Sequence, residues 1–136
     1  MKKKFRVKKE SDFQEVFNSA TSCANRNFVV YQLPKAGQKH FRVGLSVGKK
    51  IGNAVARNQM KRYLRQGLQE LEPGIVPEVD FIIIARVGSQ HLDYHQVKKN
   101  LTHVLKLANL YQESVFQKSV FQKSLQQESV EKGEIL

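Results

Sequence analysis

The segment at residues 80–86, Asp-Phe-Ile-Ile-Ile-Ala-Arg, restricts the fold of this chain more than any other. Its apolar residues follow one another without alternation, which is typical of a strand buried on both faces. Residues 28–33 are rich in β-branched and aromatic side chains. In residues 41–47 a large apolar side chain at every odd position alternates strictly with a small or charged residue. Both patterns predict strands. Because only a short turn-forming segment separates these two strands, we expect them to pair as a hairpin.

Residues 53–70 predict a helix with two different faces. Asn53 is a good N-cap, and Pro73 with Gly74 ends the pattern. At 100° per residue, an apolar arc lies opposite a cationic arc. The apolar arc contains Ala56, Met60, Tyr63, Leu64, Gly67 and Leu71. The cationic arc contains Arg57, Asn58, Lys61, Arg62 and Arg65.

Two further helices are predicted from capping boxes and apolar spacing. Ser11 and Gln14 form the first capping box and predict a helix at about 12–20. Asp93 and Gln96 form the second and predict a final amphipathic helix. The elements together predict a single α+β domain at 1–111, a size that one core can support.

The residues after 111 have a different character. The pentapeptide Ser-Val-Phe-Gln-Lys occurs twice in succession, at 114–118 and 119–123. A period of five fits neither a helix nor a strand, so its apolar residues would not gather on one face. We therefore predict a low-complexity tail at 112–136 that is disordered or loosely helical.

The charge of the chain is strongly positive and unevenly distributed. The formal net charge is +11, and no acidic residue occurs between Glu15 and Glu70. A protein that needs charge only for solubility normally mixes both signs, so this stretch indicates a polyanionic partner, most simply nucleic acid. A membrane surface is a weaker alternative, because no basic amphipathic helix carries large apolar anchors.

Features of the sequence favour a cytoplasmic protein that does not span a membrane. Cys23 is the only cysteine, so an internal disulfide is impossible. The basic start has no apolar segment after it, and no run of about 18 apolar residues occurs.

No arrangement of residues predicts a catalytic or metal-binding centre in the protein. The acidic residues are spread over predicted caps, turns and strand ends, whereas a metal-dependent nuclease needs several converging carboxylates. The glycines Gly44, Gly48 and Gly52 lack the spacing of a phosphate-binding loop. We therefore assign no catalytic residue and no metal ligand.

Two sets of residues are candidates for binding RNA. Arg57, Lys61 and Arg65 recur every fourth residue without an interleaved glutamate, which favours a stripe that binds phosphates over a merely solvated face. Phe13, Phe17 and Tyr31 could stack on unpaired bases. Ordinary core packing is the commoner role for phenylalanines one helical turn apart, and the residues alone leave both roles open.

The basic helix and its lead-in resemble the bacterial ribonuclease P protein family. Residues 57–65, Arg-Asn-Gln-Met-Lys-Arg-Tyr-Leu-Arg, are similar to the arginine-rich motif of that family, and 49–55 are similar to its lead-in. Segments at 12–17, 24–31 and 82–86 resemble family segments in the same order. The similarity covers about 5–110. The tail departs from the family, and so do Gln59 and Gln66, which stand at positions that are often charged.

The resemblance implies a fold and a function. The fold is α-β-β-β-α-β-α with a mixed four-stranded sheet and a left-handed βαβ crossover. The family's catalyst is an RNA that uses Mg²⁺, held mainly by the RNA itself, to remove the 5′ leader of precursor tRNA by endonucleolytic hydrolysis. The protein binds that RNA and the precursor tRNA, and needs no obligate protein partner.

The resemblance also implies roles for individual residues. By similarity, Phe13, Phe17 and Tyr31 line a cleft for the single-stranded leader. The residues that face the catalytic RNA are Lys49, Lys50, Asn53, Arg57, Asn58, Lys61, Arg62 and Arg65. The alternative function is a non-catalytic RNA-binding protein, such as a ribosome-associated factor, and a DNA-binding protein is weaker because no helix-turn-helix pairing is present.

Overall fold

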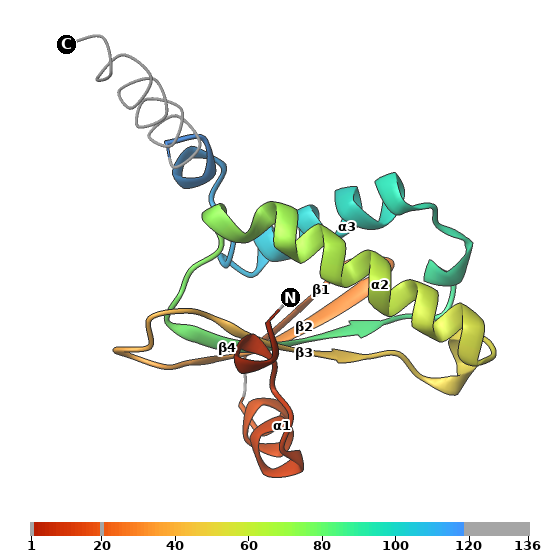
Figure 1. Ribbon diagram of the computed structural model, residues 1–136, viewed down its shortest axis with the longest axis horizontal. Helices are drawn as coiled ribbons and strands as arrows, with labels where there is room; N and C mark the ends of the chain where they lie inside the picture. Colours follow the sequence, from red (N-terminus) through yellow and green to blue (C-terminus); the bar gives the residue numbers. More distant parts are fainter. Residues whose placement is uncertain (1, 20, 119–136) are drawn as a thin grey trace, which may run out of the picture.

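A four-stranded mixed sheet forms the centre of the computed structural model, which describes residues 2–19 and 21–118. Figure 1 shows helix α1 on one face of the sheet and helices α2 and α3 on the other. The strands are β1 (Ser22–Ala24), β2 (Phe28–Pro34), β3 (Arg42–Ser46) and β4 (Val79–Ala85). The helices are α1 (Glu10–Phe17), α2 (Ala54–Leu71) and α3 (Tyr94–Leu107), with 3-10 turns η1 (Lys3–Phe5), η2 (Lys49–Ile51), η3 (Glu72–Gly74) and η4 (Ser89–His91). The predicted α+β class and four-stranded sheet are confirmed.

The strand order is β1-β2-β4-β3. Strand β4 pairs antiparallel with β2 and parallel with β3, so β3 and β4 are connected through α2 in a βαβ crossover. The expected hairpin between 28–33 and 41–47 is therefore wrong, because β4 lies between those two strands. The physical reason is that β4 is buried along almost all of its length, and a central position gives it a neighbour on each edge.

Strand β1 is the element that the residue pattern missed. It is three residues long and largely exposed, so it lacks an apolar signal. A tight turn connects it to β2, and the side chain of Asn25 stabilises this turn. Its Oδ1 accepts hydrogen bonds from the backbone N–H groups of Asn27, at 3.0 Å, and Phe28, at 2.8 Å.

The core lies between the sheet and the pair formed by α2 and α3. Leu64 and Leu68 of α2, with Leu101 and Leu105 of α3, have no exposed surface. Gly67 lets the two helices approach closely, because a Cβ there would lie 3.1 Å from the side chain of Leu101. The apolar arc predicted for α2 therefore faces this core.

Two of the three helix starts that the sequence predicts are confirmed. Asn53 caps α2, and its side chain accepts a hydrogen bond from the backbone N–H of Ala56. Asp93 caps α3 and forms the expected capping box with Gln96. The predicted cap at Ser11 is wrong, since α1 begins at Glu10 and Ser11 lies inside its first turn. Glu10 and Asp12 lie in that turn, where their negative charges interact favourably with the positive end of the helix dipole. The helix therefore begins before Ser11.

The first residues of the expected tail lie against the domain. Residues 113–118 are helical, and the Phe116 ring lies 6.2 Å from that of Tyr111. Residues 119–136 lie outside the described residues, so the predicted boundary and tail stay predictions.

A buried ion pair joins the ends of β3 and β4. Arg42 lies opposite Asp80 in the parallel register. The Arg42 Nε donates to Asp80 Oδ1 at 3.0 Å, and Nη2 donates to Oδ2, so the pair is bidentate. This hydrogen bonding raises the pKa of Arg42. Asp80 is only 1% exposed, and Asp12 of α1 lies 3.8 Å from the same guanidinium. The pair therefore connects the sheet to α1.

Replacing Asp80 with Asn should destabilise the protein by about 1–3 kcal/mol, because the amide cannot accept both hydrogen bonds at a buried position. Chemical denaturation measures the effect. The matched control is Glu15→Gln, which breaks a surface pair with Lys35 and should cost under about 1 kcal/mol. Equal small losses would show that the Arg42–Asp80 pair does not stabilise the sheet.

Candidate nucleic-acid interface

The cationic side of α2 is divided by burial into two groups. Asn58 and Arg62 are exposed to solvent. Arg57, Lys61 and Arg65 are half-buried. The five residues lie along one side of α2, as their spacing predicts, but only Asn58 and Arg62 among them are exposed.

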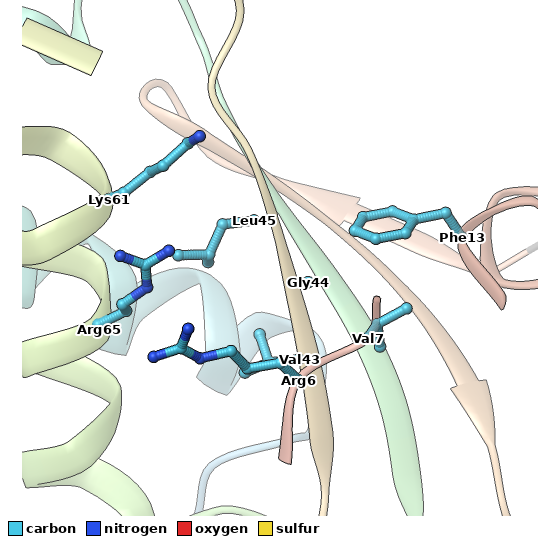
Figure 2. A pocket seen from close by; sticks show the side chains of 8 residues that line it. All are labelled: Arg6, Val7, Phe13, Val43, Gly44, Leu45, Lys61 and Arg65. Carbon is cyan, nitrogen blue, oxygen red and sulfur yellow. The ribbon is translucent and has the colours of Figure 1, made fainter. Parts of the chain in front are cut away.

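Two of the half-buried residues, Lys61 and Arg65, border a cavity of about 130 Å³ at the edge of β3. Figure 2 shows Lys61 and Arg65 reaching from α2 toward this strand, while Phe13 approaches it from the other side. The lining residues come from four segments and are Arg6, Val7, Phe13, Val43, Gly44, Leu45, Lys61 and Arg65. The volume is close to the ~150 Å³ of an engineered cavity that accepts benzene. The cavity therefore has room for one aromatic ring or one phosphate group.

The electrostatics of this cavity favour an anion. Three of its lining side chains are cationic and none is acidic. Burial lowers the pKa of Arg65, and the positive charge of Arg6 lowers it further. A phosphate between these groups would relieve the repulsion and accept hydrogen bonds from both guanidiniums. Arg6 was missed in the sequence because it lies far from the basic helix, within a run of lysines that resembles a simple basic start.

The lead-in residues border a second hollow, of about 570 Å³, at the end of the sheet. Lys49 and Lys50 lie on η2 and are exposed. Two further arginines join them across the hollow. The lining residues are Arg26, Ser46, Gly48, Lys49, Lys50, Ile51, Ile84, Ala85, Arg86 and Val87. Arg26 and Arg86 were not assigned to the site from the sequence, although Arg26 belongs to the acid-free stretch. Asn53 lies nearby in sequence, but its side chain caps α2.

The three candidate aromatic residues lie together, on the face of the sheet that carries α1. The ring centroids of Phe13 and Phe17 are 6.3 Å apart, and those of Phe17 and Tyr31 are 5.3 Å apart in an edge-to-face arrangement. All three side chains are half-buried, and none belongs to the main core cluster. Val16 is the residue of α1 that is fully buried. The arrangement leaves ring surface accessible to a base.

The aromatic group and the second hollow share this face of the sheet. Tyr31, Ile82 and Gly44 lie side by side across β2, β4 and β3, beneath the phenylalanines. Ile84 and Ser46, which line the hollow, lie two residues further along their strands, a distance of ~7 Å. A single-stranded nucleic acid can therefore place its bases on the rings and its phosphates near the cations at the sheet end.

Within the described residues, the acidic side chains do not converge on one site. Among residues 2–19 and 21–118, no three His, Cys, Asp or Glu side chains lie close enough to hold a metal ion. Acids in this part of the chain bind cations instead: Glu15 pairs with Lys35, Glu70 with Lys98, and Glu113 with Lys106. A membrane-crossing helix is also absent from the described part of the chain.

Gly44→Ala should disturb the aromatic group. A Cβ at this position would lie 2.7 Å from the Phe13 ring, so the ring must move or the strand must shift. We expect a loss of stability of about 1–3 kcal/mol, measured by thermal denaturation. Gly48→Ala is the control, because nothing lies within 4 Å of the Cβ that it adds. If the two variants melt alike, Phe13 does not pack on β3 as described.

Arg65→Gln should separate stability from RNA binding. The substitution removes a partly buried cation that repels Arg6, so the melting temperature should stay the same or rise. RNA affinity should fall, and the slope of log K against log salt should flatten by up to ~0.7–0.9 for each phosphate that the variant no longer binds. A parallel decrease of stability and affinity would indicate that Arg65 serves the fold instead.

Comparisons with known proteins show what this sequence and this fold are similar to. The sequence model of the ribonuclease P family matches residues 1–109. The ribonuclease P protein component of Latilactobacillus sakei is 62% identical over 113 residues, which are 83% of this chain and 94% of that protein. The corresponding protein of Enterococcus faecalis is 62% identical over 110 residues, which are 81% and 93% of the two chains.

Solved structures of this kind share the fold. The RNase P protein of Staphylococcus aureus superposes with a TM-score of 0.74 at 41% identity, covering 79% of this chain and 98% of the other. The RNase P protein of Thermotoga maritima gives a TM-score of 0.69 at 28% identity, with coverages of 75% and 96%. The chain therefore belongs to the ribonuclease P protein family.

Proposed function

We propose that this chain is the protein subunit of a ribonuclease P particle, in which it binds the catalytic RNA and the 5′ leader of precursor tRNA. One observation carries the proposal. The cationic side of α2 forms one surface, and the aromatic group beside the second hollow forms another. Two separate surfaces suit the binding of two RNA elements at the same time. The family match supports the same conclusion.

The two surfaces receive different RNA elements in this proposal. The α2 side chains and the η2 lysines contact phosphates of the catalytic RNA, because guanidinium and ammonium groups without acidic neighbours bind phosphates strongly. Phe13, Phe17 and Tyr31 stack on unpaired leader bases, and Arg26 and Arg86 hold the adjoining phosphates.

Magnesium belongs to the RNA in this proposal. The described carboxylates that pair with lysine or arginine do not converge, so they do not suit a protein-borne Mg²⁺ site. When bound by the RNA, Mg²⁺ would activate the attacking water and stabilise the charge that develops on the leaving oxygen. The protein contributes binding and orientation of the substrate.

Reconstitution at low Mg²⁺ tests the proposed function. The protein, the catalytic RNA and a precursor tRNA should together give faster 5′ cleavage than the RNA alone, and RNA-free protein should cleave nothing. RNA retention without stimulated cleavage would favour the alternative function, a non-catalytic RNA-binding protein. Cleavage by the RNA-free protein would disprove the assignment of catalysis to RNA.

Phe17→Ala and Tyr31→Ala should weaken binding of precursor tRNA about tenfold, because base stacking contributes ~1–3 kcal/mol per base. Binding of mature tRNA should not change, since mature tRNA has no leader to stack on these rings. Affinities for both RNAs, measured beside a thermal melt, separate stacking from packing. An equal decrease for both RNAs that follows the change in melting temperature would show that the rings only stabilise the fold.

A further inference from the structure

A groove of about 410 Å³ lies on the exposed side of α3. The residues that line it are His95, Lys98, Lys99, Thr102, His103 and Lys106. The opposite side of the helix, with Val97 and Leu101, is buried in the core. No acidic residue occurs from 94 to 112. A surface that serves only solubility normally mixes both signs of charge, so this groove suits an anionic partner.

The three lysines of the groove differ in their partners. Lys98 donates a hydrogen bond to Glu70 of α2, and the Lys106 Nζ lies 3.3 Å from a Glu113 oxygen. Lys99 is exposed, and no acidic side chain in the described part of the chain pairs with it. Lys99 is therefore available to a ligand. Lys106 is also exposed, and its ammonium group has three N–H donors, so it can bind a phosphate without leaving Glu113.

The turn between β1 and β2 connects this groove to the second hollow. Arg86, which lines the hollow, donates a hydrogen bond from Nη1 to the backbone oxygen of Asn25 at 2.9 Å. The Asn25 Nδ2 donates to the backbone oxygen of Asn100 on α3 at 2.8 Å. Arg26 follows Asn25 in the turn, is exposed, and also lines the hollow. Hydrogen bonds thus hold the cations of the hollow next to the cationic side of α3.

This connection favours one occupant, the single-stranded 5′ leader. In the proposed function, the leader places its bases on the aromatic group and its phosphates near the cations of the second hollow. A strand that continues past the hollow meets the turn at Asn25 and then the groove of α3. A single strand can follow such a path along cationic groups, whereas a double helix is too stiff to bend around the end of the sheet.

We propose that the groove of α3 binds phosphates of the leader nucleotides that lie beyond the aromatic group and the second hollow, with Lys99 and Lys106 as the contacting side chains. The inference rests on the proposed function, and it deepens that function by extending the leader-binding surface to a second helix. The two lysines are seven residues apart, which is about 10 Å along a helix, so they contact different phosphates. Affinity for precursor tRNA then increases with the length of the leader.

The test compares two precursor tRNAs that differ only in the length of an unstructured leader. Leaders of about 4 and about 16 nucleotides cover the range of site sizes of single-strand-binding domains. Both precursors carry an uncleavable scissile bond, and their affinities are measured for the particle reconstituted from the protein and the catalytic RNA. The unchanged protein should bind the precursor with the long leader more tightly.

Lys99→Gln should reduce this advantage of the long leader about two- to fivefold, as expected when one exposed charge pair is lost. Adding Lys106→Gln should reduce it further. The short leader does not reach α3, so the affinity of its precursor should change little. For the long leader, the slope of log K against log salt should flatten by up to ~0.7 for each phosphate contact that is lost.

Lys39→Gln is the matched control. Lys39 is also exposed, but it lies in the connection that follows the Pro34 end of β2, whereas the turn at Asn25 precedes the other end of that strand. This variant should keep the full advantage of the long leader. Thermal melts of all variants show that each is folded. A 4-thiouridine in the distal part of the long leader should also crosslink to a peptide that contains α3.

Several outcomes would overturn the inference. An equal loss for the short and the long leader in Lys99→Gln would place α3 against the catalytic RNA or the tRNA body instead. An advantage that persists in the double variant, or that decreases equally in Lys39→Gln, would also contradict it. Absence of any advantage with the unchanged protein would overturn the inference while leaving the proposed function intact. Failure of the unchanged protein to stimulate cleavage of any precursor by the catalytic RNA would instead reject the proposed function.

Discussion

The burial of both faces of β4 is the constraint on which the rest of the structure depends. Phe81, Ile82 and Ile83 have no exposed surface, so the strand must lie inside the sheet with protein on each side. Helices α2 and α3 cover one face along their length. The short helix α1 covers the other face only in part, and this unequal cover leaves sheet surface and aromatic side chains accessible.

The same constraint creates the sheet edge that the cationic side of α2 borders. Because β4 occupies the centre, β3 is an edge strand, and α2 connects it to β4. The N-terminal segment pairs with only part of β3. Lys61 and Arg65 extend over this edge and meet Arg6 there, so the sheet order brings together cations that are far apart in sequence. Burial and the positive charge of Arg6 lower the pKa of Arg65 there, and an anionic group between the two guanidiniums would relieve their repulsion.

Gly44 shows how the fold and the site depend on each other. Phe13 of α1 packs against β3 at this position, and its ring occupies the space that a side chain would fill. The buried Arg42–Asp80 pair, two residues earlier on β3, also reaches Asp12 of α1. The packing of Phe13 on Gly44 and the contact of Asp12 with Arg42 thus fix the position of α1. This helix carries Phe13 and Phe17, two of the three aromatic candidates.

Local sequence by itself determined the elements with a clear period or cap. The buried strand at Val79–Ala85, the two faces of α2, and the caps Asn53 and Asp93 follow from neighbouring residues, because periodicity and capping act within a few positions. The family resemblance supplied the four-stranded order of elements, which local patterns did not. Tertiary structure alone decided that β4 separates β2 from β3, that Arg6 joins Lys61 and Arg65, and that Arg26 and Arg86 meet the η2 lysines. These residues are distant along the chain, so only the packing of β4 and the helices could bring them together.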